Sequence, residues 1–181
     1  GKTNKGNPDL KPEESEAFEV GLKYNTYFLR AHIAGFYRKG KNMIDWVKEK
    51  PEDIWESQNL TKVDNLGFET NLSLLPRELG NERFFIRKIE LGYAFIHQDK
   101  DSEGYISNYA LDYLKHKFTA QLSHSIWKGF SATWYVRWQD RAGSYTKYEN
   151  LKPAYEEPYA PYCLVDMKVN WEYQRLNLYA E

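Results

Sequence analysis

The side chains with the greatest potential for chemistry are four histidines and one cysteine. His116 and His124 share one face of an expected strand, but eight residues at about 3.4 Å each separate them by about 27 Å, so they cannot share a metal ion. Together with His32 and His97 they favour structural or surface roles. Cys163 lies on the apolar face of its segment, where a packed or lipid-facing thiol is expected rather than a nucleophile.

Neighbouring carboxylates do not indicate catalysis either. The pairs at 13–14 and 156–157 fall in expected loops, and no phosphate-binding loop, hydrolase elbow or metal-ligand spacing accompanies them. One cysteine cannot form an internal disulfide or a Cys-rich zinc site. The chain has 25 Lys and Arg against 26 Asp and Glu, and a net charge of −1 gives no electrostatic basis for binding nucleic acid. We therefore expect no enzyme, no metal site, no cofactor and no nucleic-acid partner.

Binding by aromatic side chains is the better-supported chemistry. Aromatic residues make up 17% of the chain, and several fall in three long connections. Their rings give a large contact area at low entropic cost, and they can stack on corrins, porphyrins or sugars. The candidate ligand-binding residues are Trp46, Trp55, Tyr105, Tyr109, Tyr145, Tyr148, Tyr155 and Tyr159. The alternative is that these rings only pack the connections against each other.

Between these connections, apolar and polar residues alternate with a period of two. The alternation predicts strands at 16–25, 28–38, 62–74, 85–97, 111–124, 130–139 and 163–173, and one more that begins near residue 175. The sequence therefore predicts an all-β fold, an antiparallel up-and-down meander of about eight strands. The mean hydropathy of the chain is only −0.78, because it averages the apolar residues of one strand face with the polar residues of the other.

The lengths of the connections favour a membrane barrel. Those at 25–27, 125–129 and 172–174 are short and 75–84 is intermediate, whereas 39–60, 98–110 and 140–162 are long. In a meander this order places the long connections at one end of the sheet, as the outer loops of outer-membrane barrels are placed. Aromatic residues cluster at the short turns, as in an interfacial girdle. A general preference of aromatic residues for strands explains their number but not this clustering.

The polar residues of the strands form the opposite face. In a transmembrane barrel they would line the lumen, where charges cost little, whereas in a soluble β-protein they would be the wet face. The candidate lumen-lining residues are Arg30, Arg38, Lys88, Glu90, Lys117, Arg137, Asp166 and Lys168.

Three stretches resemble one family. The segment at 7–24, NPDLKPEESEAFEVGLKY, resembles the N-P-x-L-K-P-E-x-S…E-x-G motif of TonB-dependent outer-membrane receptors. The segments at 63–69, VDNLGFE, and 109–117, YALDYLKHK, are similar to later barrel strands of the family, the second especially to Bacteroidetes-type cobalamin and iron-chelate transporters. The resemblance implies a transport protein of the Gram-negative outer membrane that contacts its lipid. It also implies uptake of a scarce large solute (cobalamin, haem or a ferric chelate) and a TonB complex that acts through a plug domain.

The resemblance also implies an incomplete barrel. The family has an N-terminal plug and closing C-terminal strands, for which we find no counterpart, so we expect residues 1–181 to be a partial barrel domain. An isolated arc would expose apolar stripes and two open edges to water, so we expect it to close on itself or to associate.

A soluble carbohydrate-binding module that uses its loop aromatics is the alternative. The apolar face discriminates between the two: a soluble sandwich buries that face in a protein core, whereas a barrel turns it toward lipid.

Overall fold

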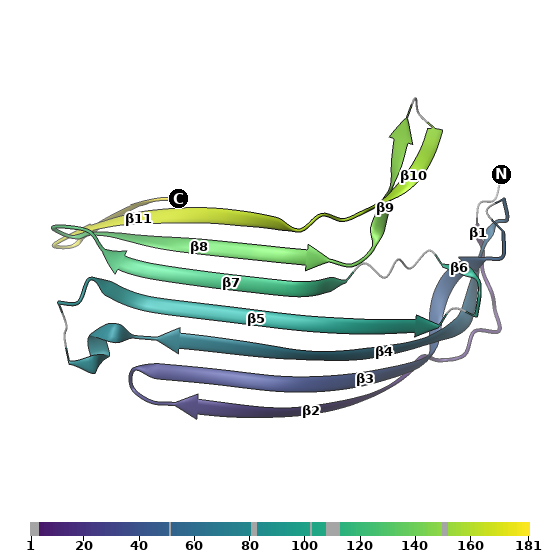
Figure 1. The fold of residues 1–181 in the computed structure, drawn as a ribbon, viewed down its shortest axis with the longest axis horizontal. Helices are drawn as coiled ribbons and strands as arrows, with labels where there is room; N and C mark the ends of the chain where they lie inside the picture. The colour runs from purple at the N-terminus through teal and green to yellow at the C-terminus, as the bar shows by residue number, and fades with distance from the viewer. Residues whose placement is uncertain (1–3, 51, 81–82, 102, 108–112, 150–151) are drawn as a thin grey trace.

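The protein is one long antiparallel sheet with extensions at one end (Figure 1). The computed structural model describes residues 4–50, 52–80, 83–101, 103–107, 113–149 and 152–181. The strands are β1 (Asn4–Lys5), β2 (Glu14–Asn25), β3 (Leu29–Lys48), β4 (Trp55–Leu74), β5 (Ile86–Asp101), β6 (Ile106–Ser107), β7 (Leu114–Ser125), β8 (Phe130–Arg141), β9 (Ser144–Glu149), β10 (Lys152–Pro158), β11 (Tyr162–Tyr173) and β12 (Leu176–Ala180), with one 3₁₀ helix, η1 (Pro76–Leu79).

The strand order confirms the predicted meander. Within the described residues the main path runs β12-β11-β8-β7-β5-β4-β3-β2, so eight strands pair in an antiparallel series. The short strands β1 and β6 add to β4 and β3 beyond this path, and β9 and β10 form a separate hairpin. The expected strands match the observed ones closely at the end where the short turns lie.

Short and long connections lie at opposite ends of the sheet, as predicted (Figure 1). We call these the turn end and the outer end. At the turn end, Lys128 and Gly129 both have positive φ angles and form the tight connection between β7 and β8. The carbonyl of Gly129 accepts a hydrogen bond from the backbone N–H of Glu172, at 3.1 Å, so this turn packs against the end of β11.

The prediction of a long loop at 39–60 is wrong, because most of this segment is strand. β3 and β4 are each 20 residues long and stay paired as far as Val47 and Glu56. Gly40 and Asn42, which suggest a turn in the sequence, instead belong to an irregularity: the register shifts between Gly40 and Met43, and Asn42 has φ 55°. A bulge of this kind bends a hairpin without ending it.

The other two long connections also contain strands. β5 continues to Asp101, and β6 then pairs with the distal part of β3. The 140–162 connection contains the β9–β10 hairpin, which rises away from the main sheet (Figure 1).

The sheet does not close on itself. β2 and β12 lie at its two edges, and no pairing joins them in the part of the chain that is described. Self-closure, one of the two expected outcomes for an isolated arc, is therefore wrong for the single chain. The other outcome, association through the apolar face, stays a prediction.

The turn at Gly129 gives a stability test. A Cβ at this position would overlap the carbonyl oxygen of Glu172, and φ is +88°. Gly104 has a similar φ of +89° but no atom within 4 Å of a Cβ, so Gly104→Ala carries the backbone strain alone. We expect Gly129→Ala to lower the free energy of unfolding of the full-length receptor by about 2–3 kcal/mol and Gly104→Ala by about 1 kcal/mol. Urea unfolding measures both, and equal losses would contradict the packing of this turn against β11.

Candidate functional site

Strand register separates the side chains of the sheet into an apolar face and a polar face. Directly opposed residues in a sheet lie on the same face, so each cross-strand row can be followed from edge to edge. One row of the apolar face runs across seven strands and consists of Tyr24, Ala31, Leu72, Leu91, Ala120, Val136 and Val165. A neighbouring row of the polar face consists of Asn25, Arg30, Ser73, Glu90, Gln121, Tyr135 and Asp166.

The apolar face is not covered by protein. Val20 and Leu22 are 77% and 75% exposed, and Val165 is 60% exposed. Among the described residues, the buried apolar side chains are few: Ala34, Val47, Pro76 and Ala132. A soluble sandwich would bury its apolar face against a second layer, so this arrangement does not favour the carbohydrate-binding module.

The polar face is concave. A hollow of about 370 Å³ on this face is lined by residues from seven neighbouring strands, from Lys23 on β2 to Asp166 on β11. Neighbouring strands lie about 4.8 Å apart, so seven strands can share one hollow only if the sheet curves around it.

All eight candidate lumen-lining residues lie on this polar face. Four of them line the hollow: Arg30, Glu90, Arg137 and Asp166. Lys88 forms an ion pair with Glu90 at 2.8 Å and lies opposite Ser123. Register places Arg38, Lys117 and Lys168 on the same face, opposite Asn65, Gln139 and Thr133. Their contact with a lumen or a plug stays a prediction.

At the outer end, Trp46 and Trp55 lie on the same face of the β3–β4 hairpin. Trp46 is opposite Ser57, and Lys48 and Trp55 follow as the next positions on that face. The Lys48 ammonium lies 4.6 Å from the centre of the Trp55 ring. We call Trp46, Lys48 and Trp55 the tip patch; it presents indole rings next to a cation, an arrangement suited to flat or anionic solutes.

The β9–β10 hairpin carries a second aromatic cluster. Lys147 lies 5.4 Å from the Tyr155 ring centre and forms a 3.0 Å ion pair with Glu157, while the Tyr145 and Tyr159 rings are 5.6 Å apart. Arg141 lies over the Tyr159 ring at 5.0 Å. Tyr148, opposite Pro153, lies on the other face of this hairpin.

Hydrogen bonding perturbs the acid–base groups of this cluster. The side chains of Lys147 and Tyr145 donate to the Glu157 carboxylate and hold its pKa below the ordinary value. The same carboxylate raises the pKa of the Tyr145 phenol, with burial as the second cause.

The candidate aromatic residues in the described part of the chain do not gather at one place. In the described part of the chain, the β9–β10 hairpin has no close backbone approach to β3, β4 or β6, so the tip patch and the tyrosine cluster are separate. Tyr105 lies directly before β6, and Tyr109 is outside the described residues.

Sequence reasoning missed the cations beside these rings, namely Lys48, Arg141 and Lys147. Lys147 and Tyr155 meet across a hairpin whose register cannot be read from the sequence, since the polar segment gives no alternation. The charged residues near the tip patch, Asp45 and Lys100, were missed for the same reason; their side chains are 2.9 Å apart.

Two of the histidines contact aromatic side chains, and His32 lies 3.9 Å from the Glu69 carboxylate. The His116 Nδ1 lies 2.8 Å from the Tyr93 hydroxyl, and the Trp134 indole N–H donates to His124 at 3.1 Å. Within the described residues, no three His, Cys, Asp or Glu side chains gather as metal ligands would. The same residues contain no helix with the length and apolarity needed to span a bilayer.

A curved antiparallel sheet of long strands, apolar on its convex face and polar on its concave face, is part of the wall of a transmembrane β-barrel. A family model described as TonB dependent receptor-like, beta-barrel, matches residues 1–181. The chain belongs to this family, which places it in the outer membrane of a Gram-negative bacterium.

Individual relatives agree with this family. The chain is 28% identical over 105 residues to the vitamin B12 transporter BtuB of Vibrio vulnificus (strain YJ016), a match that covers 50% of the chain and 17% of that relative. The chain thus spans about a fifth of the length of the curated relatives it matches.

Two solved structures share the fold. The FrpB iron transporter of Neisseria meningitidis superposes with a TM-score of 0.65 at 15% identity, covering 93% of this chain and 26% of that one. The pyoverdine receptor FpvA of Pseudomonas aeruginosa PAO1, solved with pyoverdine bound, gives a TM-score of 0.65 at 17% identity, with 92% and 24% covered.

Exchange of Glu157 tests the tyrosine cluster. Because the Glu157 pKa is lowered, the contact is complete above its ordinary pKa of 4.5 and is lost as the pH falls through the lowered value. We expect Glu157→Gln to return the Tyr145 pKa toward 10.0, because the substitution removes the negative acceptor. The ¹³Cζ resonance of Tyr145, assigned with Tyr145→Phe, reports this pKa in the full-length receptor. An unchanged titration in Glu157→Gln would contradict the contact.

A lysine scan tests which face meets lipid. Ile33 is 49% exposed on the apolar face, and Asn71, at the adjacent level of β4, is on the polar face. We expect Ile33→Lys to destabilise the receptor in phospholipid vesicles by about 2–4 kcal/mol and Asn71→Lys by much less. Unfolding in urea from vesicles gives both values, and similar losses at the two positions would show that the faces are assigned wrongly.

Proposed function

We propose that this chain forms barrel wall and outer ligand-binding hairpins of a receptor for TonB-dependent uptake of a scarce large solute, such as cobalamin, haem or a ferric chelate. Its single strongest support is the concave polar hollow that spans seven strands behind an uncovered apolar face. That combination fits a wall with lipid outside and an aqueous or protein-filled lumen inside.

In this proposal the polar face contacts a plug domain, and the TonB complex acts on that plug. The polar face carries charges of both signs, as in the row that contains Arg30, Glu90 and Asp166. A surface with charges of both signs suits a polypeptide that is docked reversibly, because charged groups of either sign on the plug can find a partner without a large net field. This chain supplies no coupling step of its own.

The solute class is inferred from the outer end. The tip patch and the tyrosine cluster both combine aromatic faces with cations, at ring distances between 4.6 and 5.4 Å. Similar proteins include a vitamin B12 transporter and an iron transporter, which supports this class of solute. Flat rings with peripheral polar or anionic groups are common to cobalamin, haem and many ferric chelates.

The tip patch gives the test of solute binding. Trp127 at the turn end has a lysine over its ring at 4.5 Å, almost the same local arrangement as Lys48 over Trp55 at 4.6 Å. We expect Trp55→Ala to weaken binding of cyanocobalamin, haemin or a ferric chelate by about tenfold or more, and Trp127→Ala to leave it unchanged. Titration of the full-length receptor with each solute measures this. Equal effects of the two substitutions, or none for Trp55, would contradict a binding role for the tip patch.

A further inference from the structure

The distal part of the β3–β4 hairpin has left the main sheet. Pairing between β4 and β5 ends at Lys62 and Asp101, whereas β3 and β4 continue together to Val47 and Glu56. Beyond β5, the hairpin is joined to the rest of the chain by two residue pairs with β6, two with β1 and a few polar contacts. Its orientation therefore depends on a small number of interactions.

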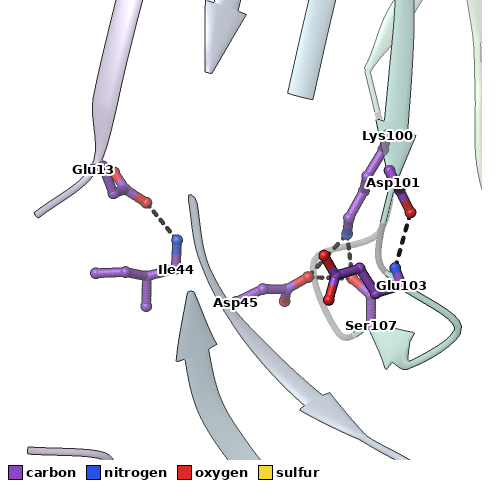
Figure 2. Close-up of polar contacts among 7 residues, drawn as sticks. All are labelled: Glu13, Ile44, Asp45, Lys100, Asp101, Glu103 and Ser107. Atoms are coloured by element: carbon purple, nitrogen blue, oxygen red, sulfur yellow. Dashed lines mark hydrogen bonds and ion pairs between the residues drawn. The ribbon is translucent and has the colours of Figure 1, made fainter. Parts of the chain in front are cut away.

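One of these interactions is buried and charged. The Asp45 residue is 2% exposed, and the Lys100 ammonium, from the end of β5, donates to its carboxylate at 2.9 Å. The Lys100 side chain is itself only 7% exposed. The Ser107 hydroxyl, from β6, hydrogen-bonds to both groups (Figure 2). We call Asp45, Lys100 and Ser107 the Asp45 cluster.

The Asp45 cluster joins three segments at one point. Asp45 belongs to the distal hairpin, Lys100 to the last pairs of the main sheet and Ser107 to β6, which lies within the β5–β7 connection. Glu13 fixes the same backbone from the other side, because its carboxylate accepts the Ile44 N–H at 2.8 Å (Figure 2). A buried charge that loses its partner is strongly unfavourable, so these segments are held together or released together.

Asp45 is also next to the tip patch. Asp45 and Val47 point to the buried side of the hairpin, and the intervening Trp46 and the following Lys48 point to the opposite side. Fixing Asp45 therefore fixes the direction in which the tip patch faces.

We propose that Asp45, Lys100 and Ser107 are positioning residues for solute binding: they hold the distal hairpin and β6 on β5 as one unit and so keep the tip patch oriented. The proposal has two parts. The structural arm, that the Asp45 cluster holds the hairpin, rests on the geometry alone, whereas the solute arm, that this orientation supports solute binding, rests on the proposed function.

Amide hydrogen exchange in the solute-free, full-length receptor tests the structural arm. We expect Asp45→Asn and Lys100→Met each to speed exchange at residues 44–48 and 106–107 by about tenfold or more, because either change removes one charge of a buried ion pair and leaves the other uncompensated. The double variant should exchange no faster than the single ones, since it leaves no uncompensated charge of this pair. The matched control is Glu56→Gln, which removes the exposed 2.8 Å ion pair with Lys5 on the same hairpin and should change exchange by less than about twofold.

Ser107→Ala is a milder change to the Asp45 cluster. It removes the hydroxyl but keeps the ion pair, so exchange should rise at 106–107 and stay unchanged at 44–48. The proposal would be overturned if the effects of Asp45→Asn and Lys100→Met on the exchange rate were additive. It would also be overturned if either variant changed the rate as little as Glu56→Gln.

Binding of cyanocobalamin and haemin tests the solute arm. For the probe that binds, Asp45→Asn should raise the dissociation rate by about tenfold and change the association rate by less than about threefold. An unchanged dissociation rate together with faster exchange would overturn the positioning role. If neither probe binds the unaltered receptor, the same rates are measured with a ferric chelate; if that does not bind either, the proposed solute class is wrong, and the exchange data still decide whether the cluster holds the hairpin.

Discussion

The alternation of side chains along each strand is the constraint on which the rest of the molecule depends. Because every second residue faces the same side, the strands produce one continuous apolar surface and one continuous polar surface. The apolar surface has no protein layer over it in the described residues, so the bilayer has to take the place of a hydrophobic core. The sheet curves around the polar surface, and the seven-strand hollow lies on that concave side.

The two ends of the sheet differ in their connections and in the residues that they carry. At the turn end the connections are short, and aromatic residues such as Trp171 and Tyr173, whose rings stack 5.8 Å apart, suit the edge of a bilayer. At the outer end the bulge around Asn42 lets the β3–β4 hairpin continue where its neighbour β5 ends. Five candidate binding residues therefore lie in hairpin strands: Trp46, Trp55, Tyr145, Tyr148 and Tyr155. Polar side-chain contacts help to hold the distal β3–β4 hairpin where the neighbouring strands have ended.

The sequence was sufficient for the membrane-embedded part of the fold and insufficient for the outer end. Strands such as β8 and β11 are read directly from alternation, since their apolar residues recur at every second position. The segment around Asp45 has no such requirement, because both its faces are polar or partly covered, and Gly40 and Asn42 signal a turn where the chain forms a bulge. The aromatic residues could be named from the sequence, but their separation into two clusters depends on register, as the opposite placement of Tyr145 and Tyr148 shows.

The length of the β3–β4 hairpin has a mechanical consequence. β3 continues for about six residues beyond the bulge at Asn42, where the hairpin leaves the main sheet, which at about 3.3 Å per residue is an arm of about 20 Å. A rotation of about 10° at the base of such an arm moves its tip by about 3.5 Å, roughly the difference between touching a solute and missing it. The hairpin thus acts as a lever, which converts small angular changes in the barrel wall into large displacements of its indole rings.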